Sequence, residues 1–301
     1  MNKPDLRDPD NKIYVICTMI ALAVTVVFTV ASLVYFAVCA PSNLHELNEG
    51  PEATTVEGFL ICLAVFLVCF YLLIRDFVKR MKGCPSEERD ARFMRAPLSK
   101  AAVLTAITVL TSLVVVAISW LIGAAISENF FSGMTNYQLL ASMLVAGPLE
   151  EGLFRILPIG VPMFIICLVC HKGSAKDILG GFGMSRAALV LIFISAVIFG
   201  IAHLDGWSFM KFPDTFISGI LFGYVYVQYG AHTTIFMHSA FDMMVSYDIF
   251  YDGLGTVPMI VLSVIGVILL VRSLIDYRKY LPGNNLHEPY EGGLLEMWEK
   301  E

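Results

Sequence analysis

Eight long runs of apolar residues limit what this chain can fold into. Most of them approach or exceed the roughly 20 residues that an α-helix needs to cross the hydrocarbon core of a bilayer. The composition agrees, because 57% of the 301 residues are hydrophobic and only 15% are charged. We therefore predict an all-α, polytopic membrane protein with about eight transmembrane helices and a buried polar site in the bundle. The runs are residues 13–39, 58–74, 101–126, 137–170, 187–204, 213–229, 233–250 and 255–274.

Lysine and arginine are concentrated in alternate connections between these runs. Eight lie within residues 75–100 and three within 172–186, whereas 40–57 and 127–136 contain none. Basic residues mark the cytoplasmic side of a membrane protein, so eight crossings place both termini in the cytoplasm of a multi-pass protein of the cell membrane. A ninth crossing would remove this asymmetry. The basic residues form no patch of the kind that binds nucleic acid, and the sequence does not determine an oligomeric state.

The fourth run, 137–170, is longer than one crossing requires and contains Pro158 and Pro162. Proline lacks a backbone N–H and clashes with the carbonyl one turn earlier. We expect a kink, a tilt or a broken helix in this run. In the sixth run, Gly219 and Gly223 form a small-xxx-small pair that would let that helix approach a neighbour closely.

Three ionisable residues lie in the middle of the fourth run: Glu150, Glu151 and Arg155. Charged groups at membrane depth are costly, and a functional site is the default explanation for them. Glu151 and Arg155 are four residues apart and can form an ion pair on one helix face. Glu150 is turned about 100° away from Glu151 on an ideal helix, so it needs another partner.

Two further pairs with the same spacing supply candidates. Phe199 precedes His203 by one turn, and His238 precedes Asp242 by one turn. A glutamate with one or two histidines can activate water directly as a general base, or can bind a divalent metal that lowers the pKa of its water. Either route hydrolyses a carbonyl substrate. His238 could donate to an oxyanion, and Asp242 could orient His238.

These residues resemble the CPBP (CAAX protease and bacteriocin-processing, or Abi) family of intramembrane proteases. Its motifs EExxxR, FxxxH and HxxxN or HxxxD occur here in that order over roughly residues 145–244. The resemblance implies that Glu150 and His203 activate water, that His238 and Asp242 form or support the oxyanion site, and that Glu151 with Arg155 holds the structure, with Phe199 in support. It leaves open a Zn²⁺ site formed by Glu150, His203 and His238, or a metal-free enzyme.

With this resemblance the chain divides into three parts. We expect an N-terminal tail and three transmembrane helices in 1–136, CPBP-like catalytic core helices in 137–250, and a last transmembrane helix and polar tail in 251–301. The implied substrate is a membrane-associated protein or peptide: a prenylated C-terminal segment, a bacteriocin-like leader or another membrane protein. The alternatives are an immunity or binding protein of the same fold and a proton-coupled transporter.

Counting along the helices places His203 near the outer end of its run and His238 about two turns from the inner end of its own. For the two to meet, a connection such as 204–212 would have to be sunk into the bundle, in a water-filled cavity. Asp214 lies near the end of a run and is expected to be solvated. For the same reason His232 is expected to be interfacial.

Overall fold

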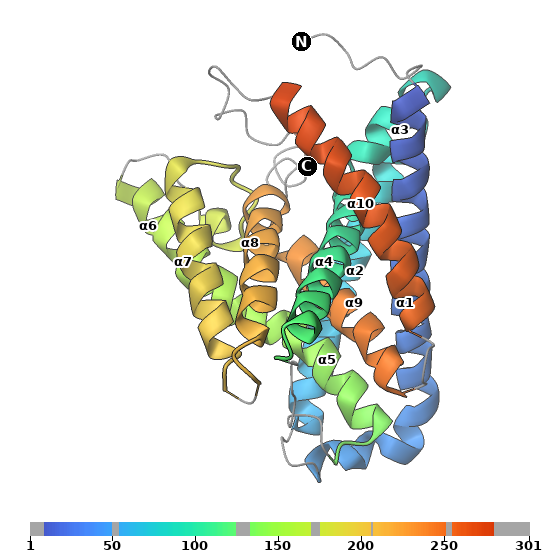
Figure 1. The fold of residues 1–301 in the computed structure, drawn as a ribbon, viewed down its shortest axis with the longest axis vertical. Helices are drawn as coiled ribbons and strands as arrows, with labels where there is room; N and C mark the ends of the chain where they lie inside the picture. The colour runs from blue at the N-terminus through green and yellow to red at the C-terminus, as the bar shows by residue number, and fades with distance from the viewer. Residues whose placement is uncertain are drawn as a thin grey trace.

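The structure is a computed structural model and describes residues 9–49, 54–124, 133–169, 175–205, 207–250 and 255–279, which are folded mainly as helices (Figure 1). The α-helices are α1 (Pro9–Asn43), α2 (Val56–Met81), α3 (Ser86–Arg95), α4 (Pro97–Leu121), α5 (Asn136–Glu151), α6 (Val161–Val169), α7 (Arg186–Ala202), α8 (Lys211–Tyr229), α9 (Ala231–Phe250) and α10 (Thr256–Lys279). A π-helix, η2 (Gly152–Gly160), joins α5 to α6, and two 3₁₀ helices are η1 (Leu44–Asn48) and η3 (Ala175–Leu179).

Each of the eight predicted runs contains a helix, so the all-α polytopic prediction is confirmed. In the described part of the chain, five helices are long and apolar enough to cross a membrane on their own. They are Lys12–Asn48, Val56–Met81, Pro97–Leu121, Asn136–Val169 and Thr256–Leu274. The apolar helix α7 is shorter, with 17 residues. The remaining two predicted spans, α8 and α9, fall outside that set.

The polarity of α9 is explained by its central position. It packs against α1, α2, α4, α5 and α8, and every residue from 231 to 240 is buried. Its polar side chains therefore meet protein rather than lipid, which is where intramembrane polar groups are tolerated. This helix carries His238 and Asp242 into the interior.

The proline-containing fourth run is a single helix that changes its hydrogen-bonding pattern without breaking. The helix extends from Asn136 to Val169 without a break and runs obliquely across the molecule (Figure 1). Its middle section, η2, contains Pro158. A π-helix bonds each N–H to a carbonyl five residues back instead of four, and such segments often occur at functional sites. Here the π-helix begins directly after Glu151.

Glycines allow neighbouring helices to pack closely at two interfaces, α7 with α8 and α5 with α9. A Cβ at Gly219 would lie 3.0 Å from Ala196 Cα, and a Cβ at Gly223 would lie 3.0 Å from Ile192 Cγ2. The predicted small-xxx-small contact is therefore confirmed, and its partner is α7 of the same chain. A Cβ at Gly147 would lie only 2.0 Å from Ser239 Oγ, which shows how closely α5 approaches α9.

Candidate active site

Glu151 and Arg155 form the closed end of the site. Glu151 Oε2 lies 3.4 Å from Arg155 Nε, and both side chains are 0% exposed, so the ion pair expected from their spacing is present. The guanidinium carbon also lies 4.5 Å from the ring centroid of Phe199 and 5.5 Å from that of Phe222. Aromatic faces stabilise a cation through the ring quadrupole. The arginine is thus held by one carboxylate and two rings.

Glu151 has a second contact that the sequence did not predict. Its Oε1 lies 2.7 Å from His238 Nδ1 on α9. A carboxylate oxygen paired with Arg155 is an acceptor, so Nδ1–H donates to it. This hydrogen bond leaves the other ring nitrogen, Nε2, facing the open part of the site. The spacing argument assigned Glu151 to Arg155 alone, because nothing local indicates that α9 lies against α5 here.

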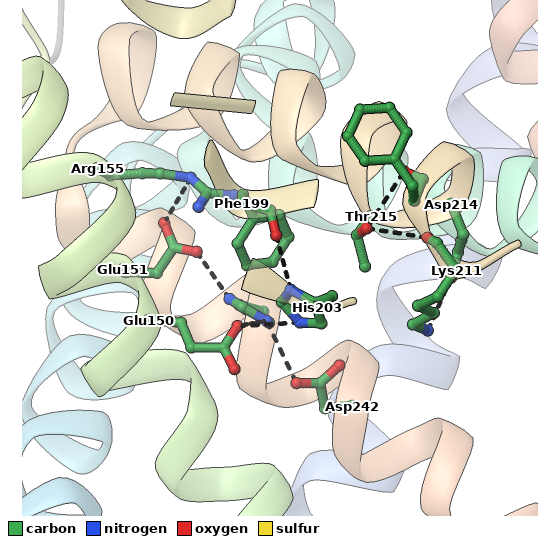
Figure 2. A network of polar contacts seen from close by, with 11 residues as sticks. Glu150, Glu151, Arg155, Phe199, His203, Lys211, Asp214, Thr215 and Asp242 are labelled. Carbon is green, nitrogen blue, oxygen red and sulfur yellow. Dashed lines mark hydrogen bonds and ion pairs between the residues drawn. The ribbon is translucent and has the colours of Figure 1, made fainter. Parts of the chain in front are cut away.

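Glu150 faces both histidines, as its separation from Glu151 suggested. Its Oε2 lies 3.8 Å from His203 Nε2 and 3.6 Å from His238 Nε2, so α5, α7 and α9 meet at one oxygen (Figure 2). This oxygen is buried and has no hydrogen-bond partner among the described residues. Both separations are too long for a direct hydrogen bond and suit an interaction bridged by water.

The tautomer of His203 follows from its other contact. Its Nδ1 lies 2.8 Å from the carbonyl oxygen of Phe199 one turn earlier in α7. A carbonyl only accepts, so Nδ1 carries the proton, and in the neutral ring Nε2 is left as an acceptor. Phe199 also contacts the His203 ring edge-on, with ring centroids 4.4 Å apart. Two acceptors, Glu150 Oε2 and His203 Nε2, therefore face each other.

Asp242 completes the cluster from the next turn of α9. Its Oδ2 lies 3.3 Å from His238 Nε2, so His238 stands among three carboxylates. Exposure rises steadily across the site. The His238 side chain is 4% exposed, Asp242 19%, His203 21% and Glu150 27%. The more exposed side of the site is therefore formed by Glu150, His203 and Asp242.

Phe222 is a contact residue that the motifs do not include. Its ring stacks on His238 with centroids 4.5 Å apart and planes 28° apart, and its side chain is almost fully buried. Phe199 reaches the same imidazole edge-on at 6.0 Å. In the sequence, Phe222 is one apolar residue in an apolar run and carries no signal of this contact.

The start of α8, which follows His203 in the chain, is held by a second group of polar contacts outside the Glu/His site. Asp214 Oδ1 accepts a 2.6 Å hydrogen bond from Ser112 of α4, and Oδ2 lies 2.9 Å from Lys211 Nζ. Lys211 Nζ also lies 4.5 Å from the ring centroid of Trp207. Asp214 is 8% exposed, so the expectation that it is solvated was wrong. The prediction assumed that a residue near the end of a helix is exposed to solvent. Asp214 is buried because α4 packs over this end of α8.

His232 was also predicted wrongly. It is buried at the start of α9 rather than interfacial, since α9 begins inside the bundle. The depth mismatch between His203 and His238 is resolved by the short helix α7. The α7–α8 connection ends above the level that α1 and α2 reach (Figure 1), and the His203 side chain is 21% exposed with its Nε2 3.8 Å from Glu150 Oε2.

The metal alternative finds no support in the geometry. Within the ranges that the structure describes, no group of three or more His, Cys, Asp or Glu side chains is arranged to hold a metal ion. The candidate set Glu150, His203 and His238 therefore does not fit a resident Zn²⁺ in this arrangement.

The fold and this site define a class: a multi-pass α-helical membrane protein with a Glu/His cluster enclosed where α5, α7 and α9 meet. Residues 132–244 match the family model described as type II CAAX prenyl endopeptidase Rce1-like. This match confirms the resemblance to the CPBP family over that segment, and it supports a membrane endopeptidase, which is a hydrolase. All the candidate site residues lie inside the matched segment. Searches of curated proteins and of solved structures found no match.

Proposed function

We propose that this protein hydrolyses a peptide bond in a membrane-associated substrate, using a water molecule activated by Glu150 and His203. The observation that carries this proposal is the position of Glu150 Oε2, a buried oxygen with no hydrogen-bond partner among the described residues, 3.8 Å from His203 Nε2. Water has two protons to donate, and these are the two acceptors that a nucleophilic water requires. His203 would orient the water, and Glu150 would take its proton.

The first step forms a carbon–oxygen bond. The water oxygen attacks the carbonyl carbon of the scissile peptide while Glu150 accepts one water proton. Negative charge develops on the carbonyl oxygen, and His238, when protonated at Nε2, donates a hydrogen bond to it. Glu151 holds the opposite nitrogen of His238 at 2.7 Å. Asp242, 3.3 Å from Nε2, keeps the ring turned toward the site.

The second step breaks the carbon–nitrogen bond. Glu150 returns the proton to the leaving nitrogen, the tetrahedral intermediate collapses, and the products are a new carboxyl terminus and a free amine. The description of the matched family favours a prenylated C-terminal segment as the substrate over a bacteriocin-like leader or another membrane protein. An apolar anchor suits a site enclosed among membrane helices.

The test measures cleavage of a farnesylated peptide ending in a CaaX sequence by protein purified in nanodiscs. Glu150→Gln keeps the side-chain shape but removes the base, and His203→Ala removes the second acceptor. Each is expected to lower kcat by about 10²- to 10⁴-fold. The matched control is Glu88→Gln, an exposed acid on α3, which should cleave at the unmodified rate. Activity of Glu150→Gln equal to that of the unmodified protein would overturn the proposal.

The same assay separates the other possibilities. No step uses a metal, so treatment with EDTA should leave the rate unchanged, and a lost rate restored by Zn²⁺ would contradict the mechanism. If the protein is an immunity or binding protein, the Glu150→Gln variant should have the same cellular phenotype as the unmodified protein. A proton-coupled transporter would move a solute into proteoliposomes without cleaving the peptide.

A further inference from the structure

The orientation of His238 is set by more than its hydrogen bonds. The 2.7 Å bond to Glu151 holds Nδ1, and Asp242 lies 3.3 Å from Nε2, but these two polar contacts do not cover the faces of the ring. Phe222 covers one face of the imidazole at a centroid distance of 4.5 Å, with planes 28° apart. Phe199 meets the ring nearly perpendicular, at 85°. The two phenylalanines together define the plane in which Nε2 points.

Phe222 is itself held rigidly. It lies on α8 between Gly219 and Gly223, two residues at which α8 closely approaches α7. A Cβ at Gly219 would lie 3.3 Å from the ring of Phe199, so the α7–α8 contact lies beside the second ring that meets His238. Close packing allows few rotamers, and a ring in this position can therefore transmit a fixed orientation to its neighbour.

We propose that Phe222 is a positioning residue for the reaction: by stacking on His238 it aims Nε2–H at the oxyanion, and by its contact with Arg155 it supports the Glu151 bond to the other nitrogen. Arg155 Cζ lies 5.5 Å from the centroid of Phe222. The proposal rests on the proposed function, because it assigns His238 to the oxyanion. It extends the site to α8, a helix that carries none of the three motifs.

The kinetic test compares Phe222→Leu with Phe222→Tyr in the farnesylated-peptide assay. Leucine fills much of the space but has no ring to stack, so kcat should fall by about 10- to 100-fold while KM changes by less than about threefold. Tyrosine keeps the ring and should recover most of the lost kcat. The matched control is Phe66→Leu. Phe66 is equally buried and stacked on Phe236, 6.1 Å away, and should lose stability without losing kcat.

An independent test needs no substrate. The protein contains six histidines, and all of them are labelled with ¹³C. The ring signal of His238 is assigned as the one that disappears in the His238→Gln variant. Loss of the stacked ring in Phe222→Leu should shift that signal, whereas Phe66→Leu should leave it in place. An unshifted signal, or a kcat equal to that of the unmodified protein, would overturn the proposal. If the unmodified protein cleaves no farnesylated peptide, the proposed function fails, and the ring signal still tests the contact.

Discussion

Glu150 and Glu151 are neighbours in the chain but have different surroundings. Glu151 is fully buried, lies 3.4 Å from Arg155 and accepts a hydrogen bond from His238. Glu150 is 27% exposed and lies 3.6 to 3.8 Å from two histidine nitrogens. A group that is fully occupied by ion pairing is poorly suited to exchange protons with a substrate. For this reason we propose the more open acid, Glu150, as the general base.

Asp242 provides a residue-scale prediction, because the endopeptidases that the chain resembles more often have asparagine at this position. An asparagine side chain here would still accept a hydrogen bond from His238 Nε2–H and would add an N–H donor. We expect Asp242→Asn to keep kcat within about tenfold of the unmodified protein, and Asp242→Leu, which cannot accept, to lose about 100-fold. Peptide cleavage and thermal unfolding are measured for both.

The control for this pair is Asp76→Asn, which alters another aspartate in an i,i+4 pair, 2.7 Å from Arg80 and far along the chain from the site. It should leave kcat unchanged. Equal losses for Asp242→Asn and Asp242→Leu would show that the negative charge is required. A normal rate for Asp242→Leu would exclude Asp242 from the site's chemistry.

At the scale of elements, the contact between α5 and α9 is what brings the two acids to His238. The two helices touch at Gly147, where an added Cβ would also lie 3.0 Å from the backbone oxygen of Ile235. Ser239 Oγ donates a 3.0 Å hydrogen bond to the carbonyl of Leu144 across the same interface. Because the neighbouring atoms are largely backbone, the interface cannot absorb an extra methyl group by a side-chain rotation.

Gly147→Ala is therefore expected to separate α5 from α9. We predict a loss of about 1–3 kcal/mol in the free energy of unfolding. We also predict a fall in kcat, because Glu151 would move away from His238. Gly152→Ala is the matched control. Gly152 lies on the same continuous helix with helical dihedrals, and an added Cβ meets no atom within 4 Å. Thermal unfolding in nanodiscs measures both variants, and equal stability would contradict the packing argument.

At the scale of the whole molecule, the basic connections gather at one end of the fold. The beginning of α1, helix α3 and the end of α10 lie at one end of the molecule, and the α1–α2 connection lies at the other (Figure 1). The eight basic residues within 75–100 belong to the first end, and the connection 40–57 has none. Basic residues favour the cytoplasmic side, so we propose that this first end and both termini are cytoplasmic.

Labelling with a membrane-impermeant maleimide tests this orientation in sealed cells. In a background without the native cysteines, Glu49→Cys, just after η1, should react from outside. Glu87→Cys on α3 should react only after the membrane is permeabilised. Both positions are exposed in the structure, so a failure to react reflects the membrane and not burial. The reverse pattern would invert the predicted topology.

The sequence by itself determined the helices, an irregularity in the proline-containing fourth run and the i,i+4 pairs around Arg155, His203 and Asp242. These properties depend on local spacing and on the cost of transferring side chains into a bilayer, and both can be read within a window of about 20 residues. The predictions for Asp214 and His232 failed because each assumed that the end of a helix lies at the membrane surface. Packing by α4 and the central position of α9 decided otherwise.

Only the tertiary structure decided which nitrogen of His238 meets which carboxylate, and that Phe222 covers its ring. Glu151 and His238 are 87 residues apart, and their contact depends on how closely α5 crosses α9. That distance is set by the absence of a side chain at Gly147 against Ser239, a property of the pair and not of either sequence segment. Local periodicity fixes the face on which a residue lies, whereas close packing of helix against helix fixes what that face meets.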